Sequence, residues 1–118
     1  MSAAAGSLLA QTRPSGTSAA LAYTATLHTE ITRVVICNTT GAAAVASLFH
    51  DDSGTTYNQT TALLYGTAIA AYSTLTIDSH VGSGFMVKPS GKIAVQTSVG
   101  SALTFSFYGI TEDISTRV

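Results

Sequence analysis

Apolar and polar residues alternate with a period of two along most of this chain. The clearest example runs from Ala102 to Ile110, where Leu103, Phe105 and Phe107 are separated by polar or smaller side chains. Because successive side chains of a strand point to opposite faces, this pattern predicts a strand with one buried face. Further segments with strand character are 19–28, 31–38, 43–50, 63–69, 73–78, 85–88 and 93–98.

Two apolar runs near the centre of the chain, 31–38 and 43–50, are rich in β-branched or small apolar residues. They are joined by Asn38-Thr39-Thr40-Gly41, and Asn and Gly both tolerate positive φ angles. The pattern predicts a strand, a turn and a return strand. A second interruption, Gly66 inside 63–69, predicts a bulge.

The first of these runs is apolar on both faces. Val34 and Ile36 lie on one face, and Val35 and Cys37 lie on the other. Such a strand is either a central strand covered on both sides, or it has one face covered by another subunit. Assigning Val34 and Ile36 to the inside, we expect these core residues: Leu27, Val34, Ile36, Leu48, Leu75, Ile77, Val95, Phe105 and Phe107.

No window of the sequence carries a helical stripe of apolar residues. About eight short strands with turn signals between them predict an all-β fold, an antiparallel β-sandwich or jelly roll. We place this domain at residues 19–110. Residues 1–18 are small and polar, and we expect an extended N-terminal arm rather than a packed element; residues 111–118 form a polar C-terminal tail.

The composition narrows the function classes. Of the 118 residues 46% are apolar, enough for a core, but only 9% are charged, against about 25% in ordinary soluble domains. A chain this poor in charge is expected to hide surface against other subunits. The net charge of −1 argues against nucleic-acid binding. No apolar run is long enough to span a membrane, and no signal peptide is recognisable. The single cysteine, Cys37, is expected to be buried as a small apolar residue.

Few residues suggest chemistry. Asp52-Ser53-Gly54-Thr55 matches the short active-site pattern of aspartic proteases, in which two carboxylates share a proton. The adjacent Asp51 departs from that pattern, and the later segment that supports such a loop is missing. The acids and histidines at 50–52 and 78–80 lack metal-ligand spacing and a nucleophile elbow. We therefore expect no catalytic residue and no cofactor, with Asp51 and Asp52 the only candidates for a metal ion.

Exposed tyrosines and isolated basic residues point instead to binding. Tyrosine is common at protein interfaces, and its ring can also stack on a sugar. Arg33, inside an apolar strand, is expected to meet an acid such as Glu30 or a partner subunit. The expected partner-binding residues are Leu8, Leu9, Arg13, Arg33, Val35, Tyr57 and Tyr65.

Residues 30–110 resemble small virion proteins of bacteriophages. The resemblance rests on a strand ending in Asn-x-Thr-Gly, a strand ending in Ser-Leu-Phe-His-Asp-Asp, an Ile-x-Ala-x-x-Thr-Leu-x-Ile strand and a closing strand ending in Phe-Tyr-Gly. These motifs are structural, so no catalytic residue is implied.

The resemblance implies a structural virion protein. The leading expectation is a capsid decoration (cement) protein on the capsid surface, a homo-oligomer and most simply a trimer. It would bind the major capsid protein and stabilise the phage head, with residues 1–18 as a clamp. One alternative is a tail, baseplate or fibre component with glycan contacts through surface tyrosines. The other is a small aspartic protease.

Overall fold

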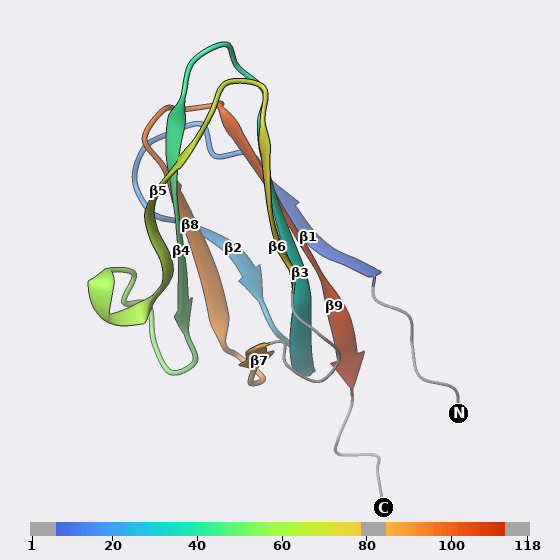
Figure 1. Ribbon diagram of the computed structural model, residues 1–118. Helices are drawn as coiled ribbons and strands as arrows, with labels where there is room; N and C mark the ends of the chain where they lie inside the picture. The colour runs from blue at the N-terminus through green and yellow to red at the C-terminus, as the bar shows by residue number, and fades with distance from the viewer. Residues whose placement is uncertain (1–6, 79–84, 113–118) are drawn as a thin grey trace, which may run out of the picture.

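The computed structural model describes residues 7–78 and 85–112, which form two antiparallel β-sheets packed face to face (Figure 1). Sheet A has the strand order β1-β9-β3-β6, with β7 pairing to β3 beyond the end of β6; sheet B has the order β2-β8-β4-β5. The elements are β1 Ser7–Thr12, β2 Ala20–Thr24, β3 His28–Asn38, β4 Ala44–Asp51, a short 3-10 helix η1 Gln59–Thr61, β5 Ala62–Ile69, β6 Thr74–Asp78, β7 Phe85–Val87, β8 Lys92–Thr97 and β9 Leu103–Glu112.

The order of the strands is that of a jelly roll. The β4–β5 hairpin is the centre of the chain's path, and the strands before it pair with strands after it in nested order: β3 with β6 and β7, β2 with β8, and β1 with β9. Strands β1 to β4 alternate between the two sheets. A long hairpin rolled up in this way gives two stacked sheets. The predicted fold class, an antiparallel sandwich of jelly-roll type, is confirmed.

The core lies between the inner faces of the two sheets. Phe105, Phe107, Val34 and Ile36 come from sheet A and are fully buried, which also settles which face of β3 is inside. Sheet B contributes other fully buried side chains, among them the expected Leu48 and Val95. Two expected residues on β6, Leu75 and Ile77, are only half-buried but pack against this core.

Strand β2 departs from the predicted alternation. Its pairing with β8 shifts register between Leu21 and Tyr23, so one extra residue reverses the faces of the strand. Leu21 is consequently 52% exposed, while Tyr23 packs against the core. The strand ends at Thr24, and the expected core residue Leu27 lies in the following loop, half-buried and outside the core. The prediction for Leu27 is wrong for this reason.

Strands β3 and β4 do not lie side by side. The predicted turn after Asn38 carries the chain from sheet A to sheet B, so β4 returns in the opposite layer (Figure 1). In β5, the predicted bulge at Gly66 is present: the pairing with β4 shifts register there, and Gly66 has φ +67°.

Residues 7–12 are not an unpacked arm. Strand β1 pairs with β9 along the edge of sheet A, and Leu9 and Ala10 pack against the core. The expectation is wrong for these residues because backbone pairing with a sheet edge does not require an apolar pattern. At the other end, β9 continues to Glu112. Residues 1–6, the segment 79–84 between β6 and β7, and the tail from 113 lie outside the described residues.

Candidate functional site

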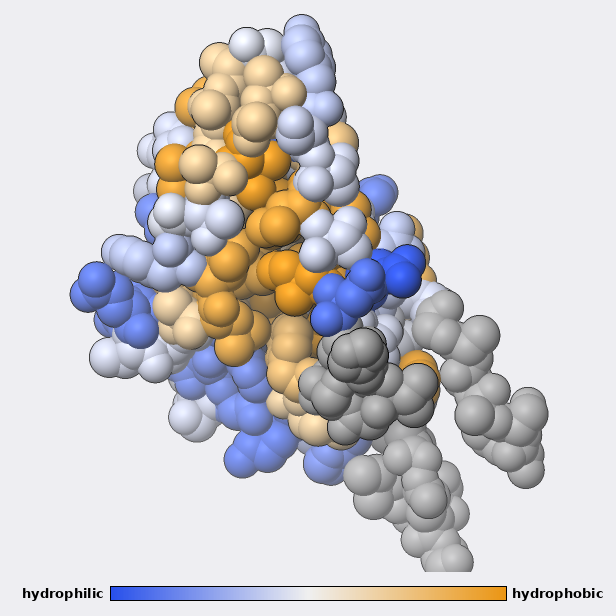
Figure 2. Space-filling model, in the orientation of Figure 1, coloured by the Kyte–Doolittle hydropathy of each residue, from blue (hydrophilic) through white to orange (hydrophobic). Residues whose placement is uncertain are grey.

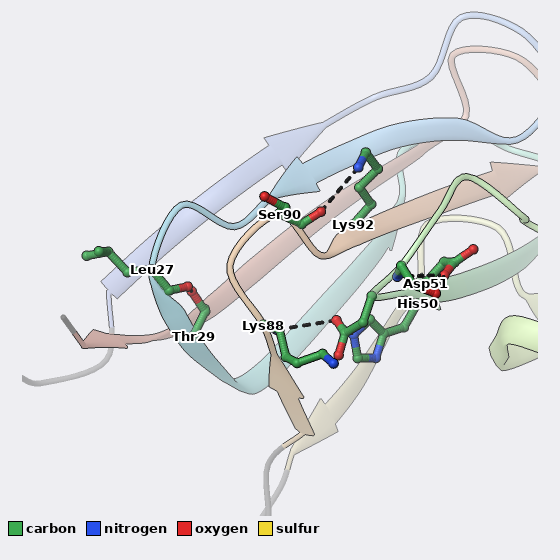
Figure 3. A network of polar contacts seen from close by, with 9 residues as sticks. Leu27, Thr29, His50, Asp51, Lys88, Ser90 and Lys92 are labelled. Atoms are coloured by element: carbon green, nitrogen blue, oxygen red, sulfur yellow. Dashed lines mark hydrogen bonds and ion pairs between the residues drawn. The ribbon is translucent and has the colours of Figure 1, made fainter. Parts of the chain in front are cut away.

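The acidic loop that suggested chemistry lies where β4 ends, close to the β7–β8 turn (Figure 3). His50 Nε2 is 2.6 Å from Asp52 Oδ1, and the backbone amide of Lys88 donates to the same oxygen at 3.3 Å. The ring of His50 also contacts that of Phe85, with centroids 5.7 Å apart. The Asp52 carboxylate therefore joins the end of β4 to the turn that follows β7.

The neighbouring acid, Asp51, organises its own loop. Its carboxylate accepts hydrogen bonds from the backbone amides of Ser53 at 3.0 Å and Thr56 at 2.9 Å. The Ser53 and Thr56 amides lower the pKa of Asp51 below its ordinary value, because they favour the ionised carboxylate. Burial, and secondarily the charge of Asp51, raise the pKa of the half-buried Tyr57 above its ordinary value.

Further polar contacts at this end of the sandwich are also local. The Thr29 hydroxyl donates to the Leu27 carbonyl at 3.0 Å, and Lys92 Nζ donates to the Ser90 carbonyl at 3.1 Å (Figure 3). Within residues 7–78 and 85–112, no three His, Cys, Asp or Glu side chains are grouped as metal ligands would be. The contacts around Asp51 and Asp52 fix loops; the second acidic segment, which includes His80, lies partly outside the described residues.

Strand β1 and the loop after it carry three of the expected partner-binding residues. Leu8, 49% exposed, lies opposite Tyr108 of β9. Leu9 is instead half-buried against the core. The guanidinium of Arg13 donates from Nε at 3.0 Å and from Nη2 at 2.7 Å to the Ser101 carbonyl, which fastens the β1–β2 loop to the β8–β9 turn. Leu8 and Arg13 are therefore exposed, whereas Leu9 is not.

The two expected residues on β3 lie on the outer face of sheet A. Arg33 forms an ion pair with Asp78, its cross-strand neighbour on β6, rather than with Glu30. The prediction of an acidic partner was right in kind, but Glu30 lies three residues away along an extended strand, whereas cross-strand neighbours are adjacent. Val35 is half-buried on the same face, opposite Ser106.

A groove lies on sheet B, away from the acidic loop. It has a volume of about 250 Å³. Strands β4, β5 and β8 and the loop between β1 and β2 all contribute to it, so its residues come from four separate parts of the sequence. The lining residues are Thr17, Val45, Ser47, Tyr65, Gly66, Gln96, Thr97 and Ser98.

Tyr65 is the aromatic member of this groove and is 57% exposed. Its ring meets the buried ring of Phe49 in a T-shaped contact, with centroids 6.4 Å apart. Next to it, the bulge at Gly66 interrupts the β4–β5 pairing, and the Gly66 amide donates to Ser47 Oγ at 3.1 Å. The bulge and the Phe49 contact thus hold an exposed tyrosine beside a serine hydroxyl.

The polar side chains of the groove are uncharged and take part in hydrogen bonds. Gln96 Nε2 donates to the Thr17 carbonyl at 3.0 Å, and Ser98 Oγ accepts the Val45 amide at 2.8 Å. A hydroxyl oxygen that accepts one hydrogen bond keeps its own O–H to donate. Of the lining residues, only Tyr65 was expected from the sequence; the others are common Ser, Thr, Gln, Gly and Val residues in no motif.

A second surface feature is an apolar strip between the two sheets, along the side where β5 and β6 form the edges (Figure 2). Half-buried side chains of β5, β6 and β7 pack against the core there without being fully covered. They are Leu64, Leu75, Ile77 and Phe85. We call these four residues the edge strip.

In the part of the chain that is described, the only helix is η1. It has three residues and is too short to cross a membrane. No protein-family model matches the chain, and neither the curated proteins nor the solved structures gave a significant match.

Proposed function

We propose that the protein is a structural subunit of a bacteriophage virion, in its leading form a capsid decoration protein that binds the major capsid protein. Support comes from the sequence resemblance over residues 30–110, from the charged fraction of only 9%, and from a jelly-roll fold, which is common among capsid domains. Such a subunit acts by burying uncharged β surface against its neighbours.

The edge strip is the observation that carries this proposal. Strands β5 and β6 are the outer strands of their sheets on the same side, so no further strand from residues 7–78 and 85–112 closes the core there. Edge strands also present unpaired backbone N–H and C=O groups, to which another strand can pair. The described residues of these two strands hold one charged side chain, Asp78, which is paired with Arg33. This edge suits a second copy of the chain.

The assembly would be a homo-oligomer, with a trimer as the favoured form. Subunits meeting head to tail around a three-fold axis would each place one surface against a different surface of the next. The exposed Leu8 and the half-buried Val35 offer a second apolar surface, on the face of sheet A that also carries the Arg33–Asp78 ion pair. The capsid would then be bound by the face that the oligomer leaves free.

The experiment adds the purified full chain to heads of the phage that encodes it, prepared without the protein, and sediments the particles. Saturable co-sedimentation supports the decoration role, and electron microscopy with an antibody locates the bound protein. Labelling of tails instead of heads would overturn the decoration form and favour a tail component. Absence of the protein from purified virions would contradict the virion role altogether.

A further inference from the structure

We propose that the groove around Tyr65 binds one residue of a neutral oligosaccharide. The groove is the surface formed by Thr17, Val45, Ser47, Tyr65, Gly66, Gln96, Thr97 and Ser98 on sheet B. This inference does not depend on the virion role, since it rests on the chemistry of the groove alone. It also uses a different surface from the edge strip.

Tyr65 forms an aromatic platform in the groove. Tyr65 is 57% exposed on a sheet, so its ring offers apolar surface that a ligand can cover. The T-shaped contact with Phe49 restrains the Tyr65 ring, so little side-chain freedom is lost on binding. A sugar is a polar ligand, but the C–H groups of its ring form an apolar face that can stack on such a platform.

The same groove also holds side chains with free hydrogen-bonding capacity. Ser47 and Ser98 each accept a backbone amide and keep an O–H donor. Gln96 Nε2 donates to the Thr17 carbonyl, and within residues 7–78 and 85–112 its Oε1 accepts no hydrogen bond. Hydroxyl and amide groups that can both donate and accept are the natural partners of sugar hydroxyls, which do the same.

The groove is uncharged and small. None of the eight described residues that line the groove is charged, so nothing there would offset the desolvation of an anionic or cationic ligand. A volume of about 250 Å³ is just below the usual range for sites that enclose a whole small molecule. An open groove of this size on a sheet suits one sugar unit of a longer neutral chain rather than an enclosed small molecule.

The test uses the full chain and five neutral oligosaccharides: maltohexaose, cellohexaose, mannohexaose, xylohexaose and chitohexaose in its N-acetylated form. Sialyllactose and a heparin hexasaccharide are the charged comparators. Binding is followed in ¹H–¹⁵N spectra through the Gly66 amide and the Gln96 side-chain amide. We expect at least one neutral sugar to bind with a Kd of about 1 mM or lower and to shift both signals.

Three variants separate binding from folding, with circular dichroism as the check on fold. Tyr65→Leu removes the ring and is expected to weaken binding by about tenfold or more, equivalent to about 1.4 kcal/mol. Tyr65→Phe keeps the ring and should bind within about threefold of the original chain. The matched control is Tyr72→Leu, because Tyr72 is a more exposed tyrosine (77%) outside the groove; its binding should not change.

Several results would overturn the proposal. Absence of binding by all five neutral sugars is one, and equal or tighter binding of the charged comparators is another. Equal losses in Tyr65→Leu and Tyr72→Leu would show that binding does not involve the groove. If the chain binds a neutral sugar but fails to co-sediment with phage heads, the result counts against the virion role only.

Discussion

Asn38 is the residue whose replacement tests the crossover between the two sheets most sharply. It ends β3, is 1% exposed, and uses its whole side chain in hydrogen bonds. Nδ2 donates to the Ala42 carbonyl at 2.8 Å and to the Ile69 carbonyl at 3.1 Å. Oδ1 accepts the amide of Thr40 at 2.9 Å and its hydroxyl at 2.8 Å. One side chain thus holds the loop leaving β3 and the end of β5.

Asn38→Ala removes all four contacts and leaves buried backbone groups without partners. A net loss of about 0.5–1.5 kcal/mol per hydrogen bond, offset where Thr40 can turn to the Ala42 carbonyl at 3.1 Å, predicts a loss of about 2–4 kcal/mol. That is a large part of the about 5–15 kcal/mol that stabilises a typical domain.

Asn38→Asp keeps the shape of the side chain and its Oδ1 acceptor, but a second carboxylate oxygen replaces the Nδ2 donor. The new carboxylate would face two carbonyl oxygens in a buried site, so both desolvation and repulsion raise its folded-state pKa. The folded state then binds the proton more tightly than the unfolded state, and stability rises as the pH falls through the folded pKa. This variant should be less stable at pH 7 than at pH 4.5, relative to the original chain.

Urea unfolding followed by circular dichroism measures both effects, because a lower midpoint at unchanged slope reports lost stability. The reasoning about Asn38 is refuted by a loss below about 1 kcal/mol in Asn38→Ala. It is equally refuted by an Asn38→Asp variant whose relative stability stays constant or falls between pH 7 and pH 4.5.

Two other predictions concern close packing and pH. A Cβ added at Gly109 would lie 2.1 Å from the Glu30 carbonyl oxygen in the β3–β9 pairing. Gly109→Ala should therefore lower the free energy of unfolding by about 1–3 kcal/mol or more. The control is Gly16→Ala, where the added Cβ lies in open space and the urea midpoint should change little. The lowered pKa of Asp51, due first to the Ser53 amide, means that its contribution to stability is present above the ordinary value of 3.8 and is lost as the pH falls through the folded pKa. An NMR titration should give a midpoint below 3.8 for Asp51, and a midpoint at or above 3.8 would contradict the loop contacts.

The sequence pattern predicts the fold where side chains decide it. Phe105 and Phe107 alternate with polar residues, and burial of that face is the only good solution for the strand. The choice between the two faces of β3 could not be made from the pattern, because Val35 and Cys37 are as apolar as the pair that is buried. Which face turns inward depends on the packing of the other sheet.

The pattern fails where the backbone decides. The bulge in β2 reverses its faces after Leu21, and nothing in the local composition marks that extra residue. Strand β1 pairs through main-chain groups, which the apolar pattern does not report. The groove around Tyr65 is assembled from segments up to about 80 residues apart, so only the exposed tyrosine itself gave a signal.

Light scattering on the purified full chain, coupled to size-exclusion chromatography, tests the proposed assembly through uncharged β surface most directly. One chain has a mass of 12.0 kDa. The proposal predicts a discrete species of three times that mass, with hydrogen exchange slowed in β5 and β6 when it forms, because a neighbouring copy would cover that edge. A mass of one chain at every concentration up to about 1 mM would contradict the proposal, because a dissociation constant above about 1 mM is too weak for a useful assembly contact.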